Sequence, residues 1–433
     1  MSGTFSRFTP AGVLPPLTAA RVRLRSFPLR LRRHLSGGAY RPEIDGLRFL
    51  AIAIVVTGHL AERLVRFFPP AHSVTELSWV ADLIQRPGLG VYLFFAVSGF
   101  ILASQAERAK AHPLSGVFLR RYFGRRIMRI EPPYLILLLA TFAIVTTTRY
   151  APEGTKQFFV APQSLIASLA GGVVYGHDLI WGTYPKLFPP GWSLEVEVQF
   201  YILAPLFFAL WLLCRSHSAR LLLGIVGLVG GSLSSLLAPP IIGPVHLEMS
   251  LLRFLHFFWL GLVLAHAQGL LARWTAKVSP WLVDLMGWGG LVAYVLLPNA
   301  PEAADMSDLA LGMALRAAAL ASVAAMFIAV FAPRSAFRRF CAMPWISLVG
   351  GACYSIYLTH LQVIQLMTAL VAKAWPDASV AALFVIGFAE ITVVLGVGLA
   401  FYAFVERFFM QPDWLRILRE RMAWPFAARA TGQ

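Results

Sequence analysis

The residue that most strongly suggests chemistry is His59, which lies inside the first long apolar run, eleven residues after Arg48. Ionisable side chains are costly in lipid hydrocarbon and persist there mainly where they line a cavity or carry chemistry. On an α-helix the two side chains fall on one face, roughly 16 Å apart along the axis. This spacing predicts a cation near one membrane surface and a titratable base deeper in, which suits an anionic ligand on one side and proton chemistry further in.

His59 is a candidate general base, because an unperturbed imidazole has a pKa of about 6.5 and can therefore take up a proton at physiological pH. Glu62 follows three residues later, at an adjacent position on a helix, where it could orient the imidazole. The alternative is a histidine whose polar atoms are satisfied by a neighbouring helix. Both interpretations remain open from these residues alone.

A basic cluster, Arg120 to Arg129, precedes Pro132 in a predicted cytoplasmic loop. Within it Arg126 and Arg129 are three residues apart, so on a helix both guanidinium groups project from one side. Their forked donors match phosphate oxygens, and a phosphorylated cytosolic donor could therefore bind here. Charge that orients the chain in the membrane, or contact with anionic lipid, explains Arg120 and Arg121 equally well.

Two carboxylates, Glu195 and Glu197, follow the sequence Pro190-Gly191-Trp192-Ser193 at the start of another apolar run. Residues two apart lie about 200° apart on a helix, so both cannot face the same cavity. We expect one to point into the bundle and the other towards the membrane interface. A buried carboxylate in a membrane needs a partner, and His59 or an arginine is the natural candidate.

Composition predicts a polytopic helical membrane protein. Of the 433 residues 58% are hydrophobic and only 13% are charged, and several apolar runs approach the roughly 20 residues that span a bilayer. The net charge of +16 does not point to nucleic acid, because the basic residues cluster between hydrophobic runs. The three cysteines form no CxxC pair, so no metal site is predicted.

The apolar runs predict an all-α transmembrane bundle of about ten spans with both termini cytoplasmic. Of the 37 Lys and Arg residues, 28 fall in the segments that this topology places inside, as the positive-inside rule requires. The predicted spans are 47–66, 88–105, 132–148, 192–213, 221–238, 252–268, 280–297, 309–331, 346–373 and 380–405.

The apolar stretch 163–176 is predicted to be re-entrant or interfacial, because an eleventh crossing would place every later basic loop outside. Its length of about 14 residues is also short for a span. The enclosing outer segment, 149–191, carries aromatic and polar side chains that predict either a sugar-binding rim or an aromatic belt at the interface. These side chains are Tyr150, Tyr175, His177, Asp178, Trp181, Tyr184 and Lys186.

Three regions are predicted along the chain. Residues 1–40 are rich in arginine and lack an apolar core, which is typical of a disordered cytoplasmic tail and not of a cleaved signal peptide. Residues 41–406 form the membrane domain. Residues 407–433 form a second basic cytoplasmic tail, too short for a core of its own.

From Tyr40 onward the chain resembles the membrane-bound acyltransferase family 3, the O-acyltransferases that modify cell-surface glycans and some lipids and antibiotics. Five motifs occur in the order typical of that family. They are Arg41-Pro42-Glu43-Ile44-Asp45-Gly46-Leu47-Arg48 leading to His59; Gly90 to Phe100; Arg126 and Arg129 followed by Pro132 and Tyr134; Trp192-Ser193-Leu194 with Glu197, Gln199, Phe200 and Tyr201; and Tyr354-Ser355-Ile356-Tyr357-Leu358-Thr359-His360.

The resemblance implies that His59 is the essential histidine and that Glu197, not Glu195, is the motif carboxylate. It implies that Arg126 and Arg129 help engage acyl-CoA from the cytoplasm, and we expect Arg48 to hold the CoA phosphates with them. Residues of the matched motifs are expected to contact the substrate. We interpret His360 as a residue that packs between helices. The expected substrate-contacting residues are Ser98, Trp192 and Tyr201.

Taken with the resemblance, the residues predict a multi-pass inner-membrane enzyme that moves an acyl group, expected to be acetyl, from acyl-CoA to a hydroxyl of a glycan or glycolipid. His59 would take the hydroxyl proton, with Glu197 or Glu62 stabilising the imidazolium, or would itself be acylated and relay the group. The alternative from another class is a transporter or flippase of an anionic lipid-linked sugar. Such proteins often show paired, broken helices in two similar halves, a pattern that we do not find here.

Overall fold

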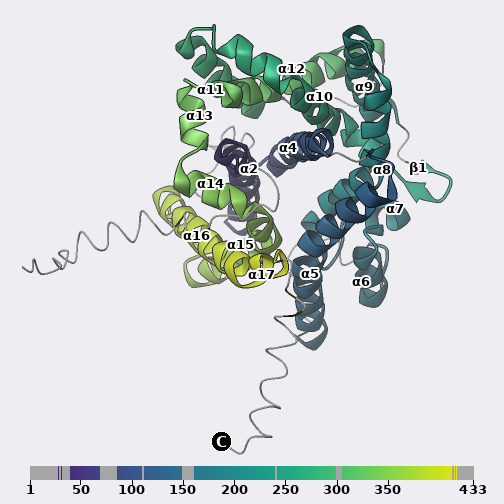
Figure 1. Cartoon of the computed structure of the whole chain (residues 1–433). Coiled ribbons are helices and arrows are strands. Elements are labelled where there is room, and N and C mark those ends of the chain that lie inside the picture. Colours follow the sequence, from purple (N-terminus) through teal and green to yellow (C-terminus); the bar gives the residue numbers. More distant parts are fainter. Residues whose placement is uncertain are drawn as a thin grey trace, which may run out of the picture.

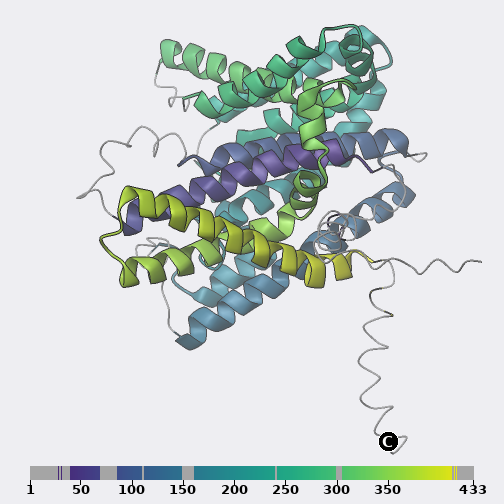
Figure 2. The ribbon, with the colours of Figure 1, turned by 90° about the vertical axis from the view of Figure 1, so that its left-hand side faces the viewer.

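The computed structural model describes residues 40–68, 85–109, 112–148, 160–238, 241–298 and 305–411, with four isolated positions nearer the termini. The predicted tails therefore lie almost entirely outside the described residues. The described part is a bundle of helices, and its long helices run in roughly the same direction (Figures 1 and 2). Nine of its helices are long and apolar enough to cross a membrane.

The centre of the bundle is formed by α2 (Pro42–Phe67) and α4 (Pro87–Arg108), which Figure 1 shows enclosed by the other helices. Glycines let α4 approach α10 (Leu251–Thr275) at backbone distance. A Cβ atom at Gly99 would lie 2.1 Å from the carbonyl oxygen of Phe258. Small residues at such crossings are typical of membrane helices, because close packing replaces the hydrophobic driving force that lipid cannot supply.

The remaining helices surround this centre in three groups (Figure 1). One group holds α9 (His217–Leu237), α10, α11 (Pro280–Leu296), α12 (Met306–Phe331) and α13 (Ala336–Cys341). A second holds α14 (Pro344–Gly351), α15 (Cys353–Ala374), α16 (Val380–Phe401), a π-helical turn η4 (Tyr402–Glu406) and α17 (Arg407–Phe409). The third holds α5 (Gly116–Thr148), α6 (Leu165–Val173), α7 (His177–Trp181), the 3-10 turn η3 (Pro189–Gly191) and α8 (Trp192–Leu213).

Proline and serine set many of the helix starts. Four helices, α2, α4, α11 and α14, have proline in their first turn, where the missing N–H costs nothing and the fixed φ favours the helix. Four others, α6, α9, α13 and α16, begin after a serine whose hydroxyl accepts a backbone N–H of the first turn, as Ser216 does from Ala219. These local signals explain why most predicted spans begin within five residues of an observed helix start; the span predicted from 132 is the main exception, since α5 begins at Gly116.

The ten predicted spans correspond to the nine long apolar helices together with α11, which has 17 residues and is shorter than the rest. The prediction of one continuous span over 346–373 was wrong. The helix is interrupted at Ala352, between α14 and α15, directly after Gly350 and Gly351. A Cβ at Gly350 would lie 1.7 Å from the carbonyl oxygen of Asp45, so α14 packs directly against the first turn of α2.

The basic cluster also differs from its prediction, because it is not a loop. Helix α5 runs without interruption from Gly116 through the arginines and through Pro132 and Pro133 to Thr148. Arg126 and Arg129 therefore have the helical spacing that places both on one side. Each lines the pocket described below.

In the part of the segment after α5 that the structure describes, from residue 160, the helices are short, α6 with nine residues and α7 with five, in agreement with a stretch that does not span the membrane. The prediction of a sugar-binding rim is not supported, because most of the side chains assigned to it are buried and cannot contact a sugar at the surface. Tyr175, His177, Asp178 and Lys186 are all buried, and of the predicted rim residues Tyr184 is exposed. Tyr150 lies outside the described residues. A two-stranded ribbon, β1 (Ile241–Ile242) and β2 (Val245–His246), follows α9.

Candidate active site

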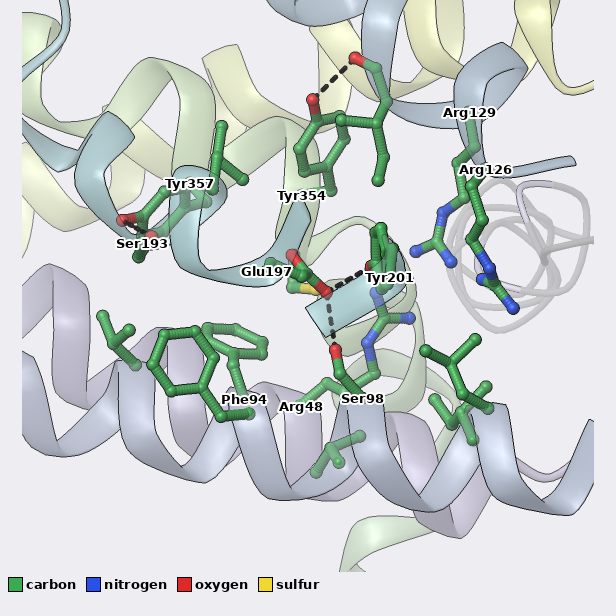
Figure 3. A pocket seen from close by; sticks show the side chains of 18 residues that line it. Arg48, Phe94, Ser98, Arg126, Arg129, Ser193, Glu197, Tyr201, Tyr354 and Tyr357 are labelled. Atoms are coloured by element: carbon green, nitrogen blue, oxygen red, sulfur yellow. Dashed lines mark hydrogen bonds between the residues drawn. The ribbon is translucent and has the colours of Figure 1, made fainter. Parts of the chain in front are cut away.

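A pocket lies where five helices meet, and it collects most of the predicted site residues (Figure 3). Its polar wall combines three arginines with one carboxylate, and its remaining wall is aliphatic and aromatic. Arg48 comes from α2, Phe94 and Ser98 from α4, Arg126 and Arg129 from α5, Ser193, Glu197 and Tyr201 from α8, and Tyr354 and Tyr357 from α15.

Glu197 is the carboxylate of this pocket. Its Oε1 accepts a hydrogen bond from the Ser98 hydroxyl at 2.6 Å and another from the Tyr201 hydroxyl (Figure 3). Two hydroxyl donors on one oxygen fix the orientation of the side chain. The motif carboxylate is thus held by α4 and by its own helix, and it faces the arginines across the pocket.

The three arginines keep donors available for an anion. Arg126 is buried, with one donor 2.5 Å from Gln105 and its guanidinium 5.7 Å from the ring centroids of both Tyr122 and Tyr201. Its Nε is buried without a hydrogen-bond partner among the described residues. Arg48 donates to Asp45 at 3.1 Å. An unpaired buried guanidinium nitrogen is costly, so these groups are suited to a phosphate or carboxylate ligand.

His59 lies in a second cluster. Its Nδ1 is 2.7 Å from Oε2 of Glu62, one helical turn later. Because a carboxylate accepts, Nδ1 of His59 carries the proton and Nε2 of the neutral ring keeps a lone pair, the arrangement that a general base needs. The ring of His360 lies beside it, with centroids 5.2 Å apart. We name these three residues the histidine cluster.

The structure therefore separates residues that we expected to meet. Arg48, Arg126, Arg129, Ser98, Tyr201 and Glu197 line one pocket, whereas His59 is not among its lining residues. The expected pairing of Glu197 with His59 is absent from the described contacts, and Glu62 takes that place. Trp192 also lies outside the pocket lining. Its indole packs against Phe95 and Phe254, with centroids 6.4 and 5.4 Å away.

Several polar residues of the site had no role in the sequence prediction. The hydroxyl of Tyr357 lies 2.6 Å from Ser193 Oγ and 2.7 Å from the carbonyl of Pro190, which ties α15 to the start of α8. Tyr354 donates to the carbonyl of Ile130 on α5 at 2.8 Å. Both tyrosines lie in a motif that the sequence singled out, but only the packing of α15 on α5 and α8 shows what they contact.

A buried carboxylate at the C-terminal end of the bundle was also missed. Glu406 is fully buried in the π-helical turn η4 and accepts a hydrogen bond from Ser355 at 2.6 Å. Ser355 follows Tyr354 on α15, so η4 supports the wall of the pocket. Nothing in the linear spacing relates position 406 to position 355.

Comparison with known proteins gives matches along most of the chain. Residues 41–404 match the model of the acyltransferase domain family. The O-acetyltransferase OatA of Staphylococcus aureus is 24% identical over 340 residues, 75% of this chain and 51% of the relative. The peptidoglycan O-acetyltransferase OatA of Listeria monocytogenes is 24% identical over 196 residues, 44% of this chain and 27% of the relative.

A third relative, the acyltransferase MdmB of Streptomyces mycarofaciens, is 26% identical over 175 residues, which is 39% of each chain. This chain spans about half or less of the length of these curated relatives. No solved structure matches it. Because the family model covers nearly the whole helical bundle, including both clusters described above, the chain belongs to the family 3 acyltransferases, whose members share this acyltransferase domain.

Proposed function

We propose that this protein is an O-acyltransferase of the inner membrane that moves an acetyl group from cytosolic acyl-CoA to a hydroxyl of a cell-surface or exported glycan. The single observation that carries the proposal is that one bundle holds two separate sites, the arginine-rich pocket and the histidine cluster with its His59–Glu62 pair. The first is chemistry for an anionic donor, and the second is chemistry for activating a hydroxyl.

The donor would occupy the pocket. Acyl-CoA carries phosphates, and the forked donors of Arg126 and Arg129 project from one side of α5, while Arg48 reaches the same cavity from α2. The aliphatic and aromatic wall, which includes Phe94 and Val91, suits the pantetheine arm. Glu197 orients Ser98 and Tyr201 at this cavity, so we assign it to donor positioning as well as to charge balance.

His59 would activate the acceptor. Its Nε2 lone pair takes the hydroxyl proton while the oxygen forms a bond to the thioester carbonyl carbon. The carbon–sulfur bond then breaks, and the CoA thiolate leaves and receives the proton. Glu62 stabilises the imidazolium formed in between. If the acyl group is instead carried on His59, Nε2 attacks the thioester carbonyl carbon, the carbon–sulfur bond breaks and the CoA thiolate leaves. The acceptor hydroxyl oxygen then attacks the acyl carbon, the carbon–nitrogen bond to His59 breaks, and the hydroxyl proton passes to the thiolate.

The acceptor class is proposed from the relatives. One of them, OatA of Listeria monocytogenes, is named a peptidoglycan O-acetyltransferase, and this chain is 24% identical to it over 196 residues. A glycan acceptor agrees with the partial exposure of the His59 side chain, 20%, and of Glu62, 32%, because a saccharide hydroxyl must reach the base.

The proposal is tested by reconstituting the full chain in liposomes with acetyl-labelled acetyl-CoA and a chitooligosaccharide as the probe acceptor. We expect label in the saccharide as an alkali-labile ester. His59→Ala should abolish transfer, since loss of a general base costs about 10²–10⁴-fold. The matched control is His217→Ala, an exposed histidine at the start of α9.

Equal activity of the His59→Ala and wild-type proteins would remove His59 from the chemistry. Transfer of a labelled lipid-linked saccharide across the liposome membrane without ester formation would overturn the proposal in favour of a flippase.

A further inference from the structure

His360 is a buried histidine with one ring nitrogen in a hydrogen bond and the other without a hydrogen-bond partner among the described residues. Its exposure is 0%, and its Nδ1 lies 2.6 Å from the carbonyl oxygen of Tyr357, one turn earlier on α15. Because a carbonyl only accepts, Nδ1 carries the proton. Nε2 therefore bears a lone pair, and it is buried with no hydrogen-bond partner among the described residues.

A buried nitrogen without a hydrogen bond lowers the stability of the folded protein, because it has lost its contact with water and gained no partner. Such an atom calls for an explanation. The ring centroid of His360 lies 5.2 Å from that of His59, with the ring planes inclined by 34°. In the neutral state Nδ1 of each ring carries the proton, so the two Nε2 atoms are both acceptors and have no reason to bond. Once His59 takes up a proton, its Nε2–H becomes a donor, and the neighbouring ring of His360 carries an unused acceptor.

We propose that His360 is a positioning residue that accepts a hydrogen bond from His59 when His59 is protonated during the reaction. The proposal rests on the proposed function of His59. Glu62 would hold the imidazolium from Nδ1, and His360 would hold it from the side of Nε2 after the acceptor oxygen has left that nitrogen. The charge formed in the membrane interior is then shared by two partners from different helices, α2 and α15.

Other groups around the pair leave this assignment intact. Arg63, on α2, interacts electrostatically with His360. Tyr184, from the segment between α7 and η3, interacts electrostatically with Glu62. Among the described residues, the titratable groups recorded beside the pair are these two, Glu62 and Tyr357.

Tyr357 connects the pair to the donor pocket. Its side chain lines that pocket, its ring centroid lies 5.5 Å from that of His360, and its carbonyl fixes Nδ1 of His360. Tyr357 is thus the residue at which the two clusters touch. A shift of its backbone on donor binding would rotate the ring of His360 relative to His59.

Two substitutions separate packing from hydrogen bonding. His360→Asn keeps an N–H group that can donate to the Tyr357 carbonyl but has no acceptor at the position of Nε2. His360→Gln can place its amide oxygen near that position. We expect His360→Asn to lower kcat by about ten- to a hundredfold, the range for a hydrogen bond to a charged group, with the KM for acetyl-CoA unchanged. His360→Gln should restore a large part of kcat.

A measurement without catalysis keeps the inference testable if a variant fails to fold. Full-length wild-type protein labelled with ¹⁵N-histidine in nanodiscs should show His360 protonated at Nδ1 with a bare Nε2. When the pH is lowered until His59 gains a proton, the Nε2 resonance of His360 should move to the position of a hydrogen-bonded nitrogen.

The outcomes are distinct. A His360 protonated at Nε2, or a His360→Asn variant with wild-type kcat, would overturn the inference. The expected resonance shift in a protein that forms no ester with any saccharide probe would support the histidine pair while rejecting the proposed function.

Discussion

Glu195 and Glu197 lie two residues apart on α8 but serve different parts of the molecule. Glu195 is buried and accepts the backbone N–H of Asp178, at the start of α7, at 2.9 Å. Glu197 points into the pocket and accepts the Ser98 hydroxyl at 2.6 Å. The helical angle of about 200° between them therefore divides one short sequence into a support for the outer segment and a wall of the site.

This division predicts unequal effects of the same conservative change. Glu197→Gln should lower kcat/KM by about ten- to a hundredfold, because an amide cannot offer a charged acceptor to the two hydroxyls or balance the arginines. Glu195→Gln should keep near-normal turnover, since its amide oxygen can still accept the N–H of Asp178. Assays at matched expression decide the question, and an inactive Glu195→Gln beside an active Glu197→Gln would reverse the assignment.

Glu62 should matter for turnover more than for donor binding. We expect Glu62→Gln to reduce kcat by about tenfold or more while the KM for acetyl-CoA stays constant, because the neutral amide stabilises an imidazolium less than a carboxylate does. Glu107→Gln provides the control, since Glu107 also pairs with a histidine, His266, away from the site. Steady-state kinetics in liposomes measure both, and a raised KM with unchanged kcat for Glu62→Gln would count against its role.

The arginines of α5 should act on the donor. Arg126→Ala and Arg129→Ala are expected to raise the KM for acetyl-CoA, each lost charge-assisted contact being worth about 1.5–3 kcal/mol. Arg120 is exposed on the same helix and is not among the pocket residues, so Arg120→Ala should change little. Initial rates at varied acetyl-CoA concentration test this. Similar KM values for all three variants would indicate that the cluster acts on topology or lipid.

Asp178 should give the outer segment a pH-dependent stability. Burial raises the pKa of this carboxyl from its ordinary value near 3.8 to about 6, although the N–H of Met249 partly opposes the shift. A raised folded-state pKa favours the protonated form, so this contribution to stability is present below about pH 4 and is lost as the pH rises through about 6. Asp178→Asn should therefore raise the unfolding temperature at pH 7.5 by about 2 °C and at pH 4 by much less.

Thermal unfolding in detergent at the two pH values measures this difference. An equal effect of Asp178→Asn at both pH values would show that ionisation of Asp178 does not limit the stability of the segment.

The sequence alone determined the architecture in outline. Long apolar runs bounded by proline and serine fix where helices start, because these signals act within one turn, and the distribution of basic residues predicts the orientation of the chain. Pairs one turn apart were also within reach of the sequence. The contact of His59 with Glu62, and the shared side of Arg126 and Arg129, follow from helical spacing once a helix is present.

Only the tertiary structure decided which of these local groups meet. The sequence could not place Glu197 with Ser98 instead of His59, nor Ser355 with Glu406, because such contacts depend on which helices are neighbours and at what height they cross. The break at Ala352 was equally hidden, since it depends on the backbone of Gly350 packing against Asp45. Helical periodicity sets the face on which a side chain lies, whereas the close packing of whole helices sets what that face touches.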